Sequence, residues 1–562
     1  MCGIWAVFGF GNNGLLCACH NFPKISHRGP DAFKIEYDSR VQNGYLGFHR
    51  LSIMDSLCGM QPMRLHKYPQ LFLICNGELY NYARLKKQYD FEYVTKCDVE
   101  VIMHIYEELG ADATAQALDG VFAFCLLDIK RSRILIARDP YGVRPLFRLR
   151  DKNGQLGICS ESKGLMDMVK SYPSDWTLEP FPPGHYEEYE LLPDGKTKLL
   201  TSVNYHKPGD KPKFQEYIPW NTLSPKDIHG NIRKLLTAAV EKRLMADRRI
   251  GCLLSGGLDS SLVAALLVKL SKANNFPYKI QSFAIGMGDS PDIVAARQVA
   301  DYLGTDHHEI SFTPKDVIEV LDDVIYQLET FDITTIRASI GMYLISRYIK
   351  RNTDTAVIFS GEGADELAQG YIYFRDAPSK IDAHNESLRL LKDIYLYDGL
   401  RADRTTSSFS LELRVPFLDL QFTNYYLSLD PALRQPQDSI EKHLLRSAFD
   451  NTDLLPSNIL WRHKEAFSDG VASIKKSLFQ IIQDLIEDRV QDVELKQAYI
   501  TYPHCTPETK EAFYYRKVFE SHYGGQAEKF TPYFWMPRWI KGISDPSARF
   551  ITHYKTDEKV ED

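Results

Sequence analysis

An apolar run, a glycine turn and a helix-like run follow one another at residues 250–268, and this order could bind a phosphate. The apolar run is Ile250–Leu254, the turn reads Ser255-Gly256-Gly257, and Asp259 and Ser260 open the third run. A strand–turn–helix junction of this kind collects unpaired backbone N–H groups and the positive end of a helix dipole. Asp259 could hold a divalent cation on a polyphosphate. The alternative is a glycine-rich connection without a ligand.

The turn differs from two common nucleotide-binding loops. It lacks the lysine of a Walker A motif, and its glycines do not have the G-x-G-x-x-G spacing of a dinucleotide-binding fold. The sequence Ser-Gly-Gly-Leu-Asp-Ser instead resembles the pyrophosphate-binding loop of the ATP pyrophosphatases, which activate a carboxylate or carbonyl as an adenylate. The resemblance implies ATP as a co-substrate.

An acidic cluster follows another apolar run and fits the same chemistry. Thr355–Phe359 is a strand candidate, and residues 360–366 after it read Ser-Gly-Glu-Gly-Ala-Asp-Glu. Asp259 and Asp365 could hold Mg²⁺ on the polyphosphate and offset the charge that moves to the leaving pyrophosphate. Glu362 would remain free for proton transfer. A solvated acidic loop is the alternative, and the pairing of the cluster with the glycine turn argues against it.

Cys2 is a second candidate for catalysis. Cysteine is small, so an initiator methionine before it should be removable, which would leave a thiol and a free α-amine on one residue. The α-amine has a reference pKa of about 7.7–8.0 and can act as a base near neutral pH. A nucleophile activated by its own amine is a known catalytic arrangement. The alternative is an inert cysteine in a buried first strand.

Three short polar segments in the first 100 residues support a catalytic Cys2. The first, residues 27–31, is a compact turn that reads His-Arg-Gly-Pro-Asp. In the second, Arg50 ends an apolar run and could bind a carboxylate bidentately. In the third, Asn76 and Gly77 place an amide side chain beside a backbone N–H, and both can donate to an oxyanion. Each segment alone could be a turn with a satisfied polar side chain.

Together with Cys2-Gly3-Ile4, these segments resemble the class II glutamine amidotransferases, whose nucleophile is the N-terminal residue. Five motifs occur in the family's order over about residues 2–191. The resemblance implies that Cys2 attacks the side-chain amide of glutamine and that Asn76 and Gly77 form the oxyanion hole. It assigns the glutamine α-carboxylate to Arg50 and the α-amine to Glu78 and Asp98. The implied glutamine site contains Arg50, Leu51, Ser52, Ile53, Met54, Asn76, Gly77, Glu78 and Asp98.

Two patterns of predicted elements position these groups. Before about residue 200, short apolar runs separated by turn residues predict antiparallel sheets with covering helices, including a helix over Asp98–Leu109. This part is expected to be an α+β domain, and the resemblance implies the αββα arrangement of N-terminal nucleophile enzymes. From Asp227 onward, strands alternate with helices, which predicts an α/β domain with a doubly wound parallel sheet of the ATP pyrophosphatase type.

A segment rich in proline and glycine separates the two patterns. Residues 192–224 include Pro193, Gly195, Pro208 and Pro212, so a linker is predicted there. The expected domains are a glutamine amidotransferase (glutaminase) domain at residues 2–191 and a synthetase domain at residues 225–540. Residues 541–562 become polar and charged and are expected to form a disordered tail.

Composition argues against several other classes of protein. The chain has 562 residues, too many for one core, and its net charge of −7 does not suggest a nucleic-acid partner. No run approaches 18 consecutive apolar residues, so no membrane span is predicted. Ten irregularly spaced cysteines do not resemble a disulfide framework, and a reduced, cytosolic protein is expected.

Over about residues 1–540 the order of motifs resembles the glutamine-hydrolysing asparagine synthetases, most strongly those of animals. Beyond the acidic cluster, the resemblance rests on residues 332–339, 400–405, 411–419, 441–446 and 461–470. It implies Mg²⁺ at Asp259 and Asp365 and makes Arg337 and Asp403 candidates for aspartate recognition. Ala364 stands where relatives often have serine, but the carboxylates on either side are kept. The implied ATP site contains Leu253, Ser255, Gly256, Gly257, Asp259, Ser260, Ile285, Ser360, Gly361 and Lys464.

The reaction implied by the resemblance joins two sites. Glutamine and water would give glutamate and ammonia through a thioester on Cys2. Aspartate and ATP would give β-aspartyl-AMP and pyrophosphate, and ammonia would convert the adenylate into asparagine and AMP. The ammonia would cross between the domains through an apolar passage. The expected partners are these small molecules, with no nucleic acid or membrane, and a homodimer is expected.

Other functions share parts of this pattern. A β-lactam synthetase-like enzyme, or another ATP-pyrophosphatase amidotransferase, is one alternative, but Cys2 with Asn76 and Gly77 argues against the first of these. A phosphoribosyl-transferring amidotransferase should lack the Ser-Gly-Gly-Leu-Asp-Ser loop. A non-catalytic protein on the same scaffold should have lost Cys2, Asp259 or Glu362, and all three are present.

Overall fold

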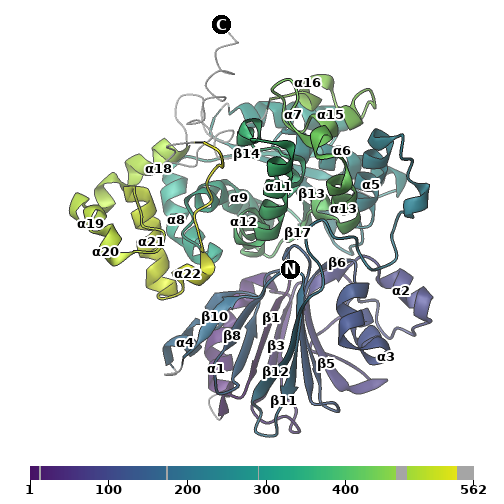
Figure 1. The fold of residues 1–562 in the computed structure, drawn as a ribbon, viewed down its shortest axis with the longest axis vertical. Helices are drawn as coiled ribbons and strands as arrows, with labels where there is room; N and C mark the ends of the chain where they lie inside the picture. The colour runs from purple at the N-terminus through teal and green to yellow at the C-terminus, as the bar shows by residue number, and fades with distance from the viewer. Residues whose placement is uncertain (12–13, 172–174, 289, 464–477, 541–562) are drawn as a thin grey trace. The chain divides into compact units, whose positions relative to one another are not determined.

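The computed structural model describes residues 1–11, 14–171, 175–288, 290–463 and 478–540. The chain divides into two compact units (Figure 1). The first unit contains residues 1–217, 245–248 and 407–412, and the second contains residues 218–244, 249–406 and 413 onward. Lys464 and the tail predicted at residues 541–562 lie outside the described residues.

Two six-stranded antiparallel sheets form the first unit, with strand orders β10-β8-β9-β1-β3-β2 and β12-β11-β7-β6-β5-β4. The first sheet contains β1 (Gly3–Phe8), β2 (Ala32–Glu36), β3 (Gly44–Arg50), β8 (Phe147–Arg150), β9 (Leu156–Cys159) and β10 (Thr177–Pro180). The second contains β4 (Met63–Leu65), β5 (Tyr68–Leu79), β6 (Gly120–Asp128), β7 (Arg133–Arg138), β11 (His185–Leu191) and β12 (Thr197–Asn204).

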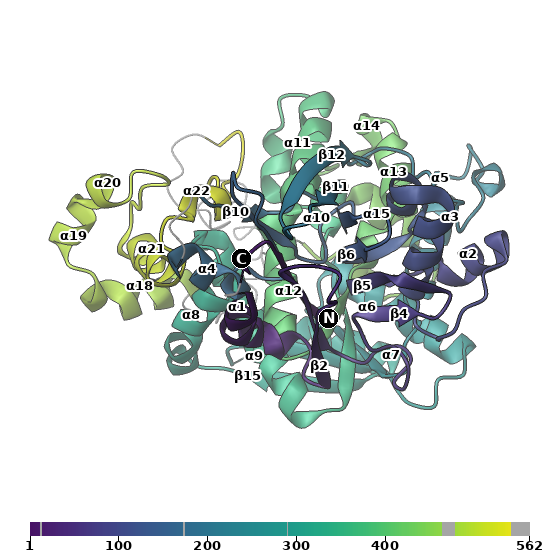
Figure 2. The same ribbon diagram turned by 90° about the horizontal axis from the view of Figure 1, so that it is seen from below.

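Apolar side chains fill the space between the two sheets and the space under helix α3 (Glu100–Ala117). Ile4 and Phe8 of β1 are buried in one cluster with alternate residues of β5, β6 and β7. The other face of β5 and β6 packs on α3, and α1 (Gly14–Asn21) lies against β3 of the first sheet. Helix α2 (Tyr82–Tyr89) lies beside α3 (Figure 2). The layers confirm the predicted αββα class.

The remaining helical segments of the first unit are short. They are η2 (Phe22–Arg28), η3 (Ser162–Gly164) and α4 (Met166–Ser171). Helix α3 begins two residues after the predicted start at Asp98 and continues beyond Leu109 to Ala117. Gly110, whose φ is 83°, interrupts the helical backbone within α3, which explains why the sequence pattern weakens there.

A five-stranded sheet with the order β15-β14-β13-β16-β17 is the centre of the second unit. β13 (Arg249–Leu253) pairs in parallel with β14 (Gln281–Gly286) and with β16 (Thr355–Phe359), and β14 pairs in parallel with β15 (Asp306–Ser311). The short strand β17 (Glu412–Arg414) follows β16 in the sheet. Helices connect the parallel strands, which confirms the predicted doubly wound α/β class.

Three helices of the second unit show how local sequence sets their starts. Asp227 caps α5 (Ile228–Glu241), accepting a hydrogen bond from the Gly230 N–H at 2.8 Å. Thr313 and Asp316 cap each other's backbone at the start of α8 (Pro314–Leu328). By contrast, α6 (Leu258–Ala273) begins after Gly257 without a side-chain cap, so its first N–H groups are left for other acceptors.

The other helical segments of the second unit surround this sheet and continue into the C-terminal part of the chain. They are η4 (Trp220–Thr222), α7 (Pro291–Leu303), α9 (Ile333–Asn352), α10 (Ala364–Ala368), η5 (Ile372–Asp376), α11 (Lys380–Asp393), η6 (Ile394–Leu396), α12 (Asp398–Ser407), η7 (Pro416–Leu418), α13 (Leu420–Ser428), α14 (Pro431–Arg434), α15 (His443–Phe449), α16 (Ser457–Leu460), α18 (Leu478–Ile486), η8 (Glu487–Arg489), α19 (Asp492–Lys496), α20 (Ala498–Thr501), α21 (Lys510–Tyr523) and α22 (Ala527–Phe530).

The segment 192–224, for which the sequence predicts a linker, is partly ordered into the first unit. Its residues 197–204 form β12, which pairs with β11 at the edge of the second sheet. The first unit accordingly continues to Tyr217. Prolines and glycines mark the turns on either side of β12, and for this reason the sequence pattern predicted a linker where the structure has a strand of ordinary length. Across the described ranges, none of the helices has the length and apolar character that a membrane crossing requires.

Candidate active sites

Cys2 lies directly before β1 and opposite the end of β3. Gly3 pairs with His49, so the next position of the antiparallel register places Cys2 beside Arg50. The Cys2 Sγ lies 3.4 Å from the backbone nitrogen of Leu51 and 3.6 Å from its carbonyl oxygen. Burial raises the pKa of the Cys2 thiol, and the positive charge of the N-terminal amine opposes that rise. The thiol therefore needs a base to become a nucleophile.

The backbone of Cys2 is held by buried charged groups. Arg28 donates from Nε to the Cys2 carbonyl oxygen at 3.0 Å, and its Nη1 pairs with Glu161 at 2.5 Å. Met1 precedes Cys2, and its amine is buried 3.6 Å from Glu412. Burial lowers the pKa of the Met1 amine. While Met1 is attached, the nitrogen of Cys2 is an amide, so Cys2 gains a basic α-amine only when Met1 is removed.

Asn76 and Gly77 lie on β5, in the sheet that faces β1. The Asn76 side chain is fully buried, and neither its amide nitrogen nor its amide oxygen has a hydrogen-bond partner among the described residues. An unpaired buried amide costs about 1–3 kcal/mol of stability, which indicates a group that awaits a ligand. Gly77 passes so close to β6 that an added Cβ would lie 2.6 Å from the Val121 carbonyl oxygen. Glycine is therefore the residue that fits there.

Charged side chains lie in the same part of the first unit as Cys2 and Asn76. Arg50 is buried, and its Nη1 donates to the Ser56 carbonyl oxygen at 3.2 Å while its Nη2 donates to that of Asp55. Asp98 accepts a hydrogen bond from the Leu79 N–H at 2.6 Å. Glu78 is buried, and its negative charge acts on the Cys2 thiol. One cation and two carboxylates thus lie in the same part of the first unit.

The remaining residues predicted for glutamine form the loop after β3. The Ser52 N–H donates to Asp31 at 2.8 Å, and the Ile53 carbonyl accepts from the Asp247 N–H at 2.8 Å. Leu51 and Ile53 are buried, and Met54 is half-buried. These contacts fix the loop that carries Leu51, the residue against the Cys2 sulfur.

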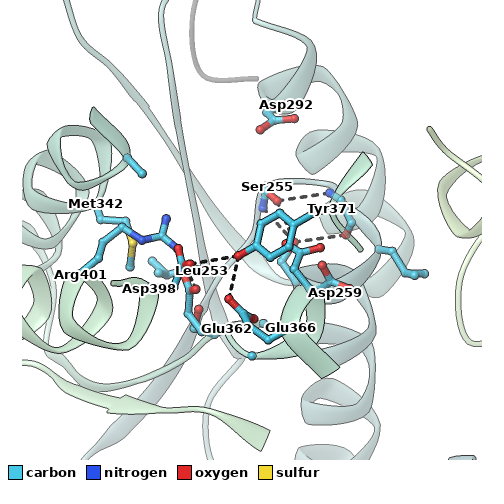
Figure 3. Close-up of a pocket in the computed structure, with 18 of the residues that line it drawn as sticks. Leu253, Ser255, Asp259, Asp292, Met342, Glu362, Glu366, Tyr371, Asp398 and Arg401 are labelled. Atoms are coloured by element: carbon cyan, nitrogen blue, oxygen red, sulfur yellow. Dashed lines mark hydrogen bonds and ion pairs between the residues drawn. The ribbon is translucent and has the colours of Figure 1, made fainter. Parts of the chain in front are cut away.

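A cavity of about 260 Å³ lies at the carboxyl ends of β13, β14 and β16 (Figure 3). It brings the two predicted clusters of the second unit together. The predicted residues that line it are Leu253, Ser255, Gly257, Asp259, Ser260, Ile285, Arg337, Ser360, Gly361, Glu362 and Asp365. Gly256 belongs to the same turn but not to the lining, and Lys464 lies outside the described residues.

Hydrogen bonds within the glycine turn fix its conformation at the edge of this cavity. The Ser255 N–H donates to the Ser260 Oγ at 3.2 Å, and the two hydroxyl oxygens lie 3.0 Å apart. The Gly257 N–H donates to the Ser255 Oγ at 3.3 Å. Because α6 starts here without a side-chain cap, the turn offers hydroxyl groups and helix N–H groups to an anion.

Replacing Gly256 with alanine should destabilise the second unit and weaken ATP binding. Gly256 has a φ of 71°, and an added Cβ would lie 2.5 Å from the backbone carbon of Ala295. The left-handed backbone and the overlap together should cost about 2 kcal/mol or more. We expect a lower melting temperature in thermal unfolding and a larger dissociation constant for ATP in titration calorimetry.

Gly257→Ala is the matched control for this prediction. Gly257 has a φ of −73°, and its added Cβ would meet only the Ser255 Oγ, at 3.3 Å. The melting temperature of this variant should stay close to that of the unaltered chain. Equal destabilisation by the two substitutions would contradict the argument from backbone geometry.

The carboxylates of Asp259 and Asp365 meet at Lys442, a residue to which sequence analysis assigned no role. The Lys442 Nζ lies 2.5 Å from the Asp365 Oδ1 and forms an ion pair with the Asp259 Oδ2. Lys442 stands 183 residues from Asp259 in the sequence. No local pattern of residue types could have connected the two.

Helix α12 supplies two further residues that sequence analysis missed. Arg401 donates from Nη2 to the Glu362 Oε2 at 2.8 Å and to the Asp398 Oδ1 at 2.7 Å. Both Asp398 and Arg401 line the cavity (Figure 3). They are three positions apart, so they share one face of the helix, and this helical spacing was the signal that could have identified them.

Tyr371 connects the Glu366 carboxyl to Asp398 of the cavity lining. Its hydroxyl donates to the Glu366 Oε1 at 2.7 Å and lies 3.0 Å from the Asp398 Oδ2, and Figure 3 shows both contacts made by this hydroxyl. Burial raises the pKa of Glu366 well above its usual value, and the negative charges of Asp398 and Asp365 raise it further. The Glu366 carboxyl therefore resists ionisation.

The two residues predicted for aspartate recognition occupy different positions. Arg337 lines the cavity, but its Nε and Nη2 bind the Glu511 carboxylate at 2.7 and 2.6 Å. Asp403 is buried outside the lining and accepts a hydrogen bond from Arg404 at 3.0 Å. Asp403 lies five positions after Asp398, a spacing that turns it toward another face of α12. Arg401 is the residue of that motif that faces the cavity.

Known proteins match both units. Residues 1–216 match the glutamine amidotransferase domain family, and residues 231–392 and 376–541 match the asparagine synthase family. A solved glutamine phosphoribosylpyrophosphate amidotransferase from B. subtilis shares 18% identity with a TM-score of 0.30, over 50% of this chain and 65% of that chain. That structural likeness is too low to support an inference.

Two curated relatives match over the whole chain. The asparagine synthetase [glutamine-hydrolyzing] of Rattus norvegicus is 54% identical over 563 residues, which cover 100% of each chain. The protein of the same name from Homo sapiens is 53% identical over 563 residues, again with 100% of each chain covered. Full coverage at this identity extends across both units, and the chain belongs to the family of glutamine-hydrolysing asparagine synthetases.

Proposed function

We propose that this chain makes asparagine from aspartate and ATP with ammonia that it releases from glutamine. The products are asparagine, glutamate, AMP and pyrophosphate, and the intermediate is β-aspartyl-AMP. The observation that carries the proposal is the presence, in one chain, of the glycine turn with its acidic cluster and of Cys2 beside an unpaired buried Asn76. The first group fits adenylate chemistry, and the second fits amide hydrolysis.

Glutamine hydrolysis takes place at Cys2. Removal of Met1 frees the α-amine of Cys2, which accepts the proton of its thiol as the sulfur attacks the glutamine amide carbon. The Asn76 side-chain amide and the Gly77 N–H donate to the oxygen that becomes negative. Arg50 binds the α-carboxylate of glutamine, and Glu78 and Asp98 bind its α-amine. Leu51, Ser52, Ile53 and Met54 complete the glutamine site.

Adenylation takes place over the glycine turn of the second unit. Ser255, Gly256, Gly257 and Ser260 bind the phosphates of ATP, with Lys464 as a further cation. Leu253 and Ile285 contact the nucleoside, and Ser360 and Gly361 border it on the β16 side. A carboxylate oxygen of aspartate attacks the α-phosphorus, and pyrophosphate leaves.

Aspartate lies beside the carboxylates and cations at the start of α12. Arg401 and Arg337 are two of the cations that line the cavity and are proposed to bind its carboxylate groups, and Asp398 is proposed to bind its ammonium group. Glu362 accepts a proton from ammonia as ammonia attacks the adenylate. Arg401 holds Glu362 in place through the 2.8 Å hydrogen bond.

Asp259 and Asp365 are the residues that would hold Mg²⁺ with ATP. Both carboxylates contact the same lysine nitrogen, so one small cation can reach both. Within the described ranges, no group of three or more His, Cys, Asp or Glu side chains is arranged to hold a metal ion. Phosphate oxygens and water would therefore complete the coordination, as Mg²⁺ commonly requires. When bound, the ion neutralises charge on the leaving pyrophosphate.

A homodimer in the cytosol is proposed on the resemblance to the family. The reduced state expected for ten irregularly spaced cysteines fits that compartment. Analytical ultracentrifugation tests the dimer, since a single species with the 64.5 kDa mass of one chain would contradict it.

Product analysis with ATP, aspartate and glutamine tests the proposed function. We expect asparagine, AMP and pyrophosphate in equal amounts, because each turnover forms and consumes one adenylate, and glutamate in at least that amount, because each asparagine takes its ammonia from one glutamine. Chromatography with ³¹P NMR separates AMP and pyrophosphate from ADP and phosphate. ADP and phosphate would exclude the adenylate mechanism, and asparagine without glutamate would exclude the glutaminase step.

A further inference from the structure

Lys442 lies where a metal ion would be expected in an enzyme of the proposed function. Its Nζ contacts the Asp365 Oδ1 at 2.5 Å and pairs with the Asp259 Oδ2, and its side chain is only 2% exposed. The side chains of Asp259 and Asp365 are 17% and 21% exposed. The Lys442 side chain is therefore more deeply buried than the two carboxylates, and all three side chains line the cavity.

The backbone around Lys442 is shaped to receive this side chain. Lys442 has a φ of 58°, a left-handed conformation that non-glycine residues adopt at a cost. Gly370 leaves the space for the lysine, since an added Cβ there would lie 2.0 Å from both the Lys442 Cε and the Asp365 Oδ1. The following helix α15 starts at His443, and the Lys442 carbonyl accepts from the Arg446 N–H at 3.0 Å. The lysine is thus built into the site.

Electrostatics favour a cation between these two carboxylates. Two partly buried carboxylates repel each other, and a cation that contacts both relieves the repulsion. An ammonium group is a compact point charge with three donors, so it can contact two carboxylate oxygens at once. The same oxygens cannot be shared by an ammonium group and a divalent cation, because the two cations repel at that distance.

We infer that Lys442 is an internal cation that holds Asp259 and Asp365 together in the nucleotide-free enzyme and excludes a divalent cation until ATP arrives. The polyphosphate of ATP changes, in two ways, which cation the two carboxylates bind. Its oxygens supply the ligands that two carboxylates alone do not provide, and its negative charge gives the Lys442 ammonium a new partner. The inference rests on the proposed function, since it takes ATP as the ligand of the cavity.

Binding of Mn²⁺ to the nucleotide-free protein tests this inference. Mn²⁺ prefers the same oxygen ligands as Mg²⁺, and electron paramagnetic resonance measures its free concentration. The unaltered chain should bind Mn²⁺ at this site only when α,β-methylene-ATP is present. Lys442→Gln should bind one Mn²⁺ per chain without nucleotide, with a dissociation constant at least about tenfold smaller than that of the unaltered chain. Lys442→Gln with Asp365→Asn should lose that site again.

The matched control is Lys242→Gln. The Lys242 Nζ also forms a buried ion pair, 2.5 Å from the Asp419 Oδ2, but it contacts one carboxylate that Arg243 also binds. This variant should gain no Mn²⁺ site, and a gain there would overturn the inference. So would equal Mn²⁺ binding by the unaltered chain with and without nucleotide, a comparison that needs no variant.

The result is separable from the proposed function. Asparagine formation by the unaltered chain tests the function, whereas Mn²⁺ binding without nucleotide tests Lys442. Circular dichroism of Lys442→Gln establishes that the variant is folded, and a folded variant that gains no Mn²⁺ site would overturn the inference.

Discussion

Cys2→Ala should abolish asparagine formation from glutamine and leave asparagine formation from ammonium salts unchanged. The Cys2 sulfur is the nucleophile of the proposed glutaminase step, and alanine cannot form the thioester. In a well-studied hydrolase, removal of the nucleophile costs on the order of 10⁶-fold in rate, so the glutamine-dependent rate should fall below detection. Ammonia enters the second reaction directly, so its use does not depend on the thiol. Asparagine is measured with each nitrogen source at saturating ATP and aspartate.

The control for this substitution is Cys19→Ala. Cys19 is an exposed thiol of the first unit, and its loss should leave both activities near those of the unaltered chain. Loss of ammonia-dependent synthesis in Cys2→Ala would contradict the division into two sites. Persistence of glutamate formation would show that another residue is the nucleophile.

The elements predicted correctly from the sequence are those whose residues are neighbours in the chain. The strand predicted at Ile250–Leu254 is β13 at Arg249–Leu253, and the strand predicted at Thr355–Phe359 has those bounds in the structure. Apolar runs of this length between turn residues have few other ways to be buried. Because both strands are parallel neighbours, their following turns had to meet at one edge.

The sequence could not reveal partners that lie far along the chain. Lys442 reaches Asp259 across 183 positions, and Glu511 reaches Arg337 across 174. Each of these charges alone is typical of an exposed helix face, and only the fold shows that it is buried and paired. Arg337 is the clearest case, since a cation predicted for substrate has a carboxylate of the chain on its guanidinium.

An intermediate case is the motif of α12. From residues 400–405 the sequence suggested Asp403 as a candidate for aspartate, and the structure places Arg401, with Asp398, in the cavity lining. Helical spacing separates these two choices, because positions 398 and 401 share a face that position 403 does not. Reading the motif as a string does not separate the two residues, whereas placing it on a helix does.

Glu362→Gln should block asparagine formation and spare glutamine hydrolysis. The substitution keeps the size of the side chain and removes the negative charge that Arg401 binds at 2.8 Å. An amide cannot accept the proton of attacking ammonia, and general base catalysis typically contributes about 10²–10⁴-fold in rate. Asparagine formation should fall by that factor with either nitrogen source. Glutamate formation without ATP should stay near that of the unaltered chain, since Cys2 is untouched.

The matched control for Glu362 is Glu309→Gln. Glu309 lies on β15 outside the cavity lining and pairs with Arg297 at 2.7 Å on an exposed face. Exposed ion pairs contribute little to stability, so this variant should keep both reactions. If Glu362→Gln forms asparagine at a rate within about tenfold of that of the unaltered chain, the effect is too small for the loss of a general base. The proton would then have to pass to another acceptor, and Asp398 is the carboxylate that Arg401 would still hold in the cavity.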